Sequence, residues 1–314
     1  MDALSRVLES LDALRNLRAL SVLLGTFASA GLLLAMAEAS LAKAGGGPLW
    51  WGPLQAGAAL TVAFYGGNAA GLLVMDDARG LPVRDVGDAL RAALASAHRL
   101  ILALLLLLAG YALLAAGVVG LLWLCRLSVT GPVLGPLLFA LAVPLGVLAL
   151  GLALLSLVAV VVPLAAPAVW SGAGTLAVVR SLLRLVRRRL LVVALLMAAV
   201  SLLTAAVGVI VTFVVMAGGR AVAELGVAVV GVHVPVQQLM AGLFGYGLRS
   251  LGASASPAGA SAHGAAALVG GGVVFALALV LPGLVYLRGA CAVYLALNGG
   301  ADEAVAPTAQ EPGS

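Results

Sequence analysis

The sequence has very little charge, and almost none of that charge is lysine. Only 9% of its 314 residues are charged, whereas soluble domains usually carry about a quarter. Lys43 is the single lysine among 17 basic residues, which together with the bias toward small aliphatic residues indicates a GC-rich bacterial genome. Hydrophobic residues make up 63% of the chain, and its mean hydropathy is +1.20. A soluble fold cannot bury so much apolar surface, so the composition indicates a chain embedded in lipid.

Motifs of known chemistry are also missing. Cys125 and Cys291 lack the spacing of a metal or redox site, and His98, His233 and His263 lack the spacing of metal ligands. The chain contains no phosphate-binding glycine loop, nucleophile elbow or Ser-Lys pair. The middle of each apolar run is almost free of the acids and bases that coupled transporters need. We therefore expect no enzyme activity, no cofactor, no metal and no proton- or ion-coupled transport.

Six long apolar runs are present instead. A membrane-spanning helix needs about 20 mostly apolar residues, and the run 100–125 lacks the alternation of a membrane β-strand. The fold class that follows is all-α, a polytopic transmembrane helix bundle of about six spans. Pro144 and Pro163 lie in one long run, and we predict a kink near the first and a helix end near the second. The runs cover 19–37, 52–75, 100–124, 133–162, 190–217 and 265–287.

The first apolar run has two interpretations. Arg15 and Arg18 precede it, and it ends in Ala35-Met36-Ala37, which has the small-x-small form of a signal-peptidase site. The segment before the run is longer than that of a typical signal peptide and carries acidic residues. We favour an uncleaved span, with a cleaved signal peptide as the alternative.

The connections between the spans fall into two classes. The arginine-rich ones are 1–18, 76–99 and 176–189, and the arginine-poor ones are 38–51, 125–132 and 218–264. When Arg288 is counted at the end of the last span, 13 basic residues lie on the first side and 4 on the other. The positive-inside rule then places both termini in the cytoplasm, with six spans. We expect the membrane to be a bacterial inner membrane.

A short repeat precedes three of the spans. Asp12-Ala13-Leu14-Arg15 recurs as Asp88-Ala89-Leu90-Arg91 and, more weakly, as Ala177-Val178-Val179-Arg180. Each copy is a basic amphipathic stretch, so we expect three units of an interfacial helix followed by a transmembrane hairpin. The predicted organisation is a cytoplasmic amphipathic helix at 1–18, a six-helix transmembrane domain at 19–297 and a disordered cytoplasmic tail at 298–314.

The basic stretches are candidates for contact with lipid headgroups. Leu90, Leu94, Ala97 and Ile101 recur at helical spacing and predict an apolar face that lies on the membrane. Each arginine near an anionic leaflet contributes about 1 kcal/mol to membrane binding. The same residues could instead serve only to fix topology, which is the interpretation we favour. They are Arg84, Arg91, Arg99, Arg180, Arg184, Arg187, Arg188 and Arg189.

The second span carries a stripe of small residues at four-residue spacing, namely Ala59, Ala63, Gly67 and Gly71. Small residues let two helices approach closely in lipid, where association depends on packing. We expect this stripe to pack against another helix of the same chain, with a dimer seam as the alternative.

The same span contains the polar residues that are the best candidates for a site. Tyr65 and Asn68 could line a polar path, but a buried amide more often forms an interhelical hydrogen bond. Asp76 and Asp77 follow at the cytoplasmic end, where negative charge opposes the helix dipole. We expect them to pair with Arg84 or another arginine close by. A shared divalent ion is less favoured, because adjacent helical residues point about 100° apart.

Three segments carry a resemblance to known proteins. They are 68–80, 88–90 and 292–297, and they resemble a group of bacterial multi-pass inner-membrane proteins with no assigned chemistry. More distantly, the arginine-bearing helix before each hairpin is similar to the membrane domain found beside some glycerophosphodiester phosphodiesterases. The sequence contains no phosphodiesterase catalytic domain, so the resemblance implies a membrane fold and no activity.

Three functional hypotheses follow. The one we favour is a non-catalytic membrane protein that organises lipids, in particular anionic ones, or partner proteins including a second copy of itself, without binding nucleic acid. The second is a permease or exporter that moves a small molecule or lipid by an uncharged route past Asn68, Tyr65 and Asp76. The third, with the least support, is an enzyme that acts on lipid headgroups through Asp76 and Asp77.

Overall fold

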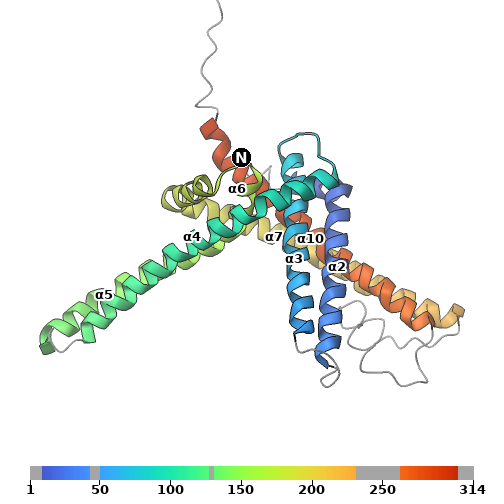
Figure 1. Ribbon diagram of the computed structural model, residues 1–314, viewed down its shortest axis with the longest axis horizontal. Helices are drawn as coiled ribbons and strands as arrows, with labels where there is room; N and C mark the ends of the chain where they lie inside the picture. The colour runs from blue at the N-terminus through green and yellow to red at the C-terminus, as the bar shows by residue number, and fades with distance from the viewer. Residues whose placement is uncertain (1–8, 43–49, 127–130, 231–261, 303–314) are drawn as a thin grey trace, which may run out of the picture. The chain divides into compact units, whose positions relative to one another are not determined.

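The chain is helical in the part that the structure describes, residues 9–42, 50–126, 131–230 and 262–302 (Figure 1). This computed structural model contains no strand among those residues, and six of its helical segments are long and apolar enough to cross a bilayer. The protein is therefore a multi-pass integral membrane protein of the all-α class, as predicted. The elements are η1 (Glu9–Arg15), α2 (Leu17–Ala42), α3 (Trp51–Ala78), α4 (Val86–Arg126), α5 (Gly131–Ser156), the π-helical turn η3 (Leu157–Val161), α6 (Val162–Trp170), α7 (Thr175–Val230) and α10 (Ala262–Asp302).

The helices form two compact units. The N-terminal unit comprises Leu8–Ala93 and Ser201–Arg288, and the central unit comprises Leu94–Val200 with Met1–Val7 and Gly289–Ser314. Three helices, α4, α7 and α10, contribute residues to both units. The predicted division into a leading helix, one membrane domain and a tail stays a prediction.

The N-terminal unit begins with a 3₁₀-helix where an amphipathic helix was predicted for 1–18. In the described residues this helix is η1, and α2 follows it almost directly. Ser10 and Ala13 of η1 are buried, so this short segment packs against the protein. Residues 1–8 and the predicted tail beyond Asp302 lie outside the described residues.

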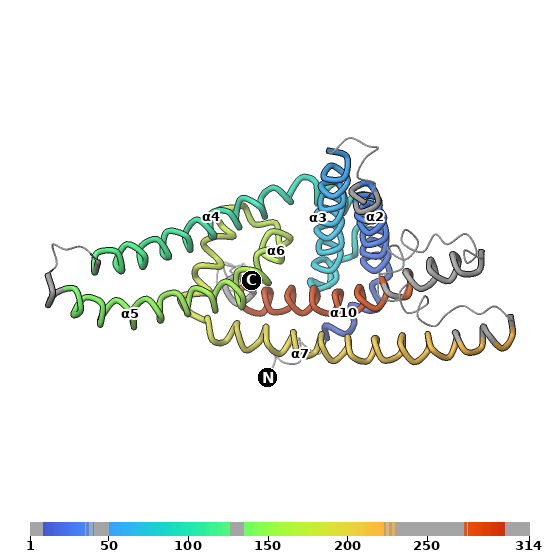
Figure 2. The backbone as a smooth tube through the Cα atoms, turned by 90° about the horizontal axis from the view of Figure 1, so that it is seen from below, coloured from blue at the N-terminus to red at the C-terminus, as the bar shows by residue number. Residues whose placement is uncertain are grey.

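α2 and α3 form an antiparallel hairpin in the N-terminal unit (Figures 1 and 2). The two helices approach closely at Gly66 of α3, where an added Cβ would lie 2.6 Å from Cγ2 of Thr26 in α2. Farther along the pair, Ser40 Oγ lies 3.0 Å from Gln55 Oε1. A side chain no larger than hydrogen at the crossing lets the backbones meet, which is how helices associate in lipid.

The basic stretches join their spans in two different ways. α4 runs without a break from Val86 to Arg126, so no interfacial helix is separated from the span there. Its 41 residues extend over about 60 Å, about twice the thickness of the bilayer's hydrocarbon core. In α7, by contrast, Arg189 has non-helical backbone angles (φ −139°, ψ 23°) and divides a basic first segment from a long apolar one. The apolar segment continues to Val230, beyond the predicted end at residue 217.

The central unit contains the proline-rich run, and its helical course ends at Trp170 and not near Pro163 as predicted. Pro144 lies inside α5. The π-helical turn 157–161 precedes Pro163, and within it the Val162 N–H donates to the Leu157 carbonyl. Pro163 then falls in the first turn of α6, where its missing N–H needs no partner. The wider turn thus accommodates the proline without ending the helix.

α4 and α5 form a second hairpin, in the central unit (Figure 2). The hydroxyl groups of Tyr111 in α4 and Ser156 in α5 lie 2.7 Å apart. Ser156 is buried and donates its own hydrogen to the Ala153 carbonyl at 2.8 Å, so Tyr111 supplies the hydrogen for the contact between the helices. An added Cβ at Gly146 would lie 3.1 Å from Val118 Cγ1, so these helices also pack closely.

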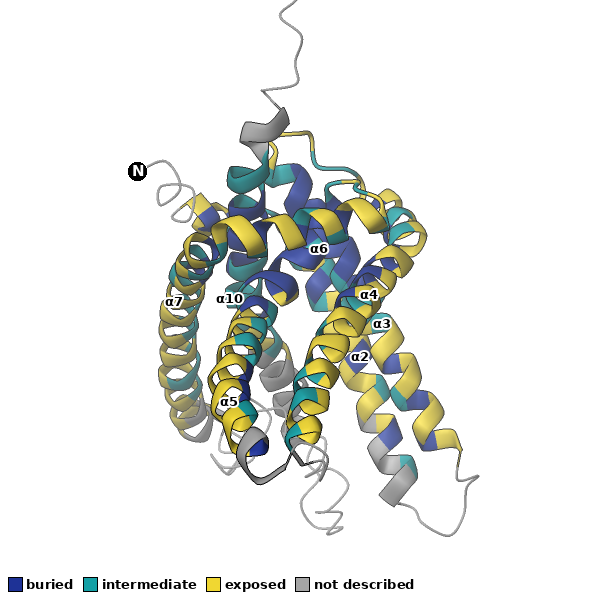
Figure 3. Ribbon diagram, turned by 90° about the vertical axis from the view of Figure 1, so that its left-hand side faces the viewer, coloured by how far each residue is buried: buried dark blue, intermediate teal, exposed yellow. Residues whose placement is uncertain are grey.

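α10 packs against α7 in each unit. In the central unit an added Cβ at Gly289 would lie 2.6 Å from Cγ1 of Val200, and in the N-terminal unit one at Gly208 would lie 3.9 Å from Pro282. Buried side chains of the central unit gather on α6 and on the last part of α10 (Figure 3). Within the described residues the apolar stretch of α10 covers 276–298, which extends past the predicted end at residue 287.

Candidate functional site

The site is built where α3 ends. Gly80 has a φ of +67°, its N–H donates to the Asp77 carbonyl at 3.0 Å, and the Leu81 N–H donates to the Asp76 carbonyl at 3.0 Å. These two bonds form a Schellman motif, which needs a left-handed residue that glycine adopts without steric cost. The motif turns the chain back over the end of α3, so the loop residues that follow can reach the acidic side chains.

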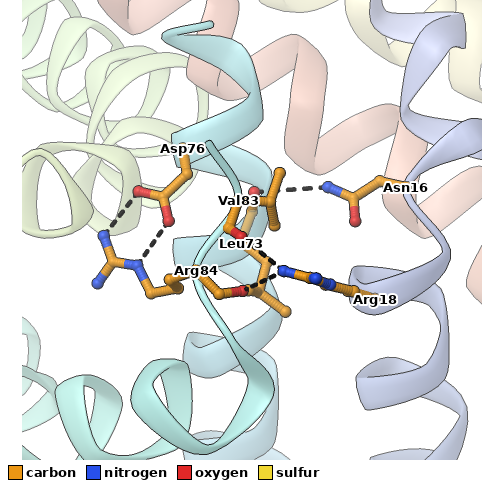
Figure 4. A network of polar contacts seen from close by, with 6 residues as sticks. All are labelled: Asn16, Arg18, Leu73, Asp76, Val83 and Arg84. Carbon is orange, nitrogen blue, oxygen red and sulfur yellow. Dashed lines mark hydrogen bonds and ion pairs between the residues drawn. The ribbon is translucent and has the colours of Figure 1, made fainter. Parts of the chain in front are cut away.

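Asp76 and Arg84 form a bidentate ion pair in this turn (Figure 4). Arg84 Nε and Nη2 lie 2.5 and 2.6 Å from the two carboxylate oxygens. Asp76 is buried, whereas the Arg84 side chain is 34% exposed. The hydrogen bonds with Asp76 raise the pKa of Arg84 above its usual value, although burial acts to lower it. The guanidinium therefore stays charged and neutralises a carboxylate that has no access to water.

The start of α2 holds the same loop in place. Arg18 Nη1 donates to the Val83 carbonyl at 2.6 Å. Asn16 caps α2, because its Oδ1 accepts the Ala19 N–H at 3.0 Å, and its Nδ2 lies 3.5 Å from the Leu73 carbonyl of α3. Figure 4 shows these side chains converging from α2 on the end of α3. The first turn of α2, the last turn of α3 and the loop after it therefore form one polar network.

Asp77 pairs with a different helix. Its Oδ2 contacts Nη1 of Arg288 in α10, whose side chain is 14% exposed. Arg288 lies inside the apolar stretch 276–298, so the prediction that it ends the last span is wrong. A charged side chain within an apolar span is costly unless it is paired. Asp77 supplies that partner, and the two adjacent aspartates consequently bind two arginines on different elements.

No protein-family model matches the chain. No curated protein and no solved structure matches it either. Because a helical bundle can host many functions, the function is inferred from the residues of the sites themselves.

Tyr65 and Asn68, predicted to share a polar site with the two aspartates, have contacts of their own farther along α3. Asn68 is buried and donates to the Phe64 carbonyl of its own helix at 2.8 Å. The Tyr65 ring packs edge-on against Phe64, with 5.4 Å between ring centroids. Asn68 and Asp76 are eight residues apart on one helix, about 12 Å along its axis. A polar path past all these residues stays a prediction.

The small-residue stripe is only partly used for packing within the chain. Ala59 and Gly71 are buried, but Ala63 is exposed and no atom lies within 4 Å of a Cβ added at Gly67. The contact with α2 instead uses Gly66, one position earlier. Packing of Ala63 and Gly67 against another helix of the chain, or against a second chain, stays a prediction.

A second cluster of charge lies on the first segment of α7. Arg180, Arg184, Arg187 and Arg188, which we call the arginine face, are all exposed. None of them forms an ion pair with any residue that the structure describes. Of the other arginines singled out, Arg91 pairs with Asp88 in an exposed contact of 3.2 Å, and Arg99 and Arg189 are exposed. The arginine face therefore has spare capacity to bind anions.

The sequence did not reveal the structural roles of two residues, the ion pair of Arg288 with Asp77 and the close helix contact at Gly66. Arg288 carried a usable signal, because an arginine followed by a further nine mostly apolar residues needs a carboxylate partner. Both aspartates were instead expected to pair with arginines close by in the sequence, such as Arg84. Gly66 had no such signal, since Gly66 and Gly67 are neighbours and only the position of α2 decides between them. Among the described residues, no group of three or more His, Cys, Asp or Glu side chains could hold a metal ion.

Proposed function

We propose that this is a non-catalytic protein of a bacterial inner membrane that holds anionic lipids at the cytoplasmic leaflet through the arginine face of α7. The observation that supports this most is the contrast between two groups of arginines. Arg84 and Arg288 neutralise aspartates, whereas the arginine face is exposed and has no acidic partner in the described residues. Lipid phosphates are the anions that meet such a surface at a membrane, and each arginine contributes about 1 kcal/mol to that attraction.

The cytoplasmic placement is supported by the distribution of arginine. The connections after the second and fourth spans carry most of the basic residues, and cytoplasmic connections of inner-membrane proteins show this bias. An even number of spans also puts the two chain ends on the same side. The cytoplasmic leaflet is the one in which anionic lipids give the stronger negative surface potential.

The absence of catalysis is supported by how the two aspartates are engaged. Asp76 and Asp77 are the acids that the third hypothesis required for attack on a lipid headgroup. Each is already bound by an arginine, and Asp76 is buried. A carboxylate held in a bidentate pair is a poor general base, because its basic oxygens are occupied and its charged form is stabilised.

The lipids that copurify with the protein provide the test. Wild type and the variant with all four arginines of the face replaced by glutamine are purified in a mild detergent, and bound phospholipids are quantified per protein. The anionic share is expected to fall severalfold in the variant, since each lost arginine weakens binding by about fivefold. Arg220→Gln is the control, because Arg220 pairs with Glu224 on its own helix and lies on the arginine-poor side of the chain. An unchanged anionic share in the fourfold variant would overturn the proposal.

Transport is a second candidate, and the pair of Asp77 and Arg288 is the observation that favours it. A charged pair at an apolar stretch of α10 is costly, and such residues often mark a transport path. Our main proposal expects no movement of fluorescent lipid across proteoliposomes beyond that in protein-free vesicles. Lipid movement that wild type shows and Asp77→Asn lacks would favour transport instead.

A further inference from the structure

The arginine face forms a narrow row along the first segment of α7. At about 100° per residue, Arg180, Arg184, Arg187 and Arg188 lie within about 100° of the helix circumference. The row extends over about 12 Å along the axis, because neighbouring residues rise about 1.5 Å. The opposite side of the segment is buried by Val178, Leu182 and Leu185. The packing of those three residues turns the arginines away from the protein.

Exposed apolar residues border the row. Leu176 and Leu183 lie beside the arginines on the helix, and they are 62% and 42% exposed. Beyond the break at Arg189, Leu191 is 71% exposed and begins the apolar segment of α7. Charged and apolar side chains that share one exposed surface fit the boundary between headgroups and acyl chains. A ligand that carries both phosphate and acyl chains matches this surface better than a soluble anion does.

Among the described residues, no acidic side chain pairs with the arginines of the row. The sequence contains no acidic residue between Asp88 and Glu224. Like charges three or four residues apart on a helix repel each other, so the row is destabilised until anions bind it. One phosphate accepts hydrogen bonds from one or two guanidinium groups. A single phosphate therefore covers only part of a 12 Å row.

We infer that the arginine face binds a phospholipid with two phosphates joined by a short bridge such as glycerol, in preference to lipids with one phosphate. This inference rests on the proposed function and names the lipid class that the same site selects. Arg180 and Arg184, which lie one turn apart, bind one phosphate, and the pair of Arg187 and Arg188 at the other end of the row offers a guanidinium from either residue to the second phosphate. Linking the two phosphates in one molecule makes the second contact intramolecular, which raises affinity without any new contact.

Delipidated full-length protein in detergent provides the test, with lipid binding followed by native mass spectrometry. Diphosphate and monophosphate phospholipids are compared at equal total phosphate, and glycerol bisphosphate without acyl chains is a third ligand. Wild type is expected to bind the diphosphate lipid about 10-fold more tightly than the monophosphate lipid. Arg180→Gln with Arg184→Gln, and separately Arg187→Gln with Arg188→Gln, should each remove that preference while monophosphate lipid still binds. Arg220→Gln, at an arginine that pairs with Glu224 on its own helix, is the control and should keep the preference.

Two results would overturn the inference. The first is equal affinity of wild type for the two lipids at equal phosphate, which leaves the proposed function standing if the fourfold variant still loses anionic lipid. The second is displacement of the diphosphate lipid by glycerol bisphosphate at similar concentration, which would assign the site to a soluble phosphate ligand. Loss of all anionic lipid preference by Arg220→Gln would contradict the proposed function itself.

Discussion

The Cβ position of Gly66 in α3 points into Thr26 of α2, with 2.6 Å to the Thr26 Cγ2 atom. We predict that Gly66→Ala destabilises the protein by about 2 kcal/mol, because neither backbone can move without breaking the hairpin contact. Thermal unfolding in detergent, followed by circular dichroism, measures the loss. Gly67→Ala is the matched control, since no atom lies within 4 Å of its Cβ position. Equal melting temperatures for the two variants would refute the close approach.

We expect Arg84 to contribute to the stability of the fold mainly because it neutralises Asp76, which is buried. Arg84→Gln leaves a carboxylate without its partner and should cost about 2 kcal/mol of unfolding free energy. This figure is lower than for a fully buried pair, because Arg84 is a third exposed and partly screened. The double variant Asp76→Asn with Arg84→Gln should lose less than the single arginine variant. Additive losses in that double-mutant cycle would show that the two side chains do not interact.

Asp77 should be needed to keep Arg288 in an apolar stretch. We expect Asp77→Asn to lower the yield of monodisperse protein and its melting temperature, because the charge of Arg288 then has no carboxylate partner. Adding Arg288→Leu to that variant should restore much of the stability, since a hydrophobic replacement for a buried pair is well tolerated. If the double variant is no better than Asp77→Asn alone, an unpaired arginine is not the cause.

The hydroxyl of Tyr111 should contribute to the hairpin of α4 and α5. Tyr111→Phe removes the hydrogen that Ser156 accepts, and about 1 kcal/mol should be lost. Tyr65→Phe is a suitable control, because the structure gives the Tyr65 hydroxyl no hydrogen bond in the described residues. Similar melting temperatures for both variants would mean that the Tyr111 contact adds nothing to stability.

The spans and the ion pair of Asp76 could be predicted from the sequence for simple reasons. Long apolar runs have few alternatives to a lipid-embedded helix, and two acids at a helix end next to an arginine-rich loop have obvious partners. Helix faces were harder to predict. A difference of one residue rotates a side chain by about 100°, so Gly66 and Gly67 are indistinguishable until α2 is placed. The end of the proline-rich helix was missed because a π-helical turn, which has no sequence signature, accommodates Pro163.

The long connection after α7 was predicted to begin at residue 218, but α7 continues to Val230. Arg220 and Glu224 look like loop residues in an apolar chain, but they pair four residues apart within a continuing helix. Charge marks the end of an apolar run more reliably than it marks the end of a helix. The same reason explains Arg288, where α10 continues through a charged residue to Asp302.

The central claim is that the arginine-bearing connections face the cytoplasm together. Single cysteines at Leu81 and Leu176, both exposed, and at Trp50 in the arginine-poor connection test it directly. They are placed in a chain whose Cys125 and Cys291 are replaced by alanine, and intact spheroplasts are treated with a membrane-impermeant maleimide. We predict that only the cysteine at position 50 reacts until the membrane is permeabilised. Labelling of position 81 or 176 in intact spheroplasts would contradict the claim.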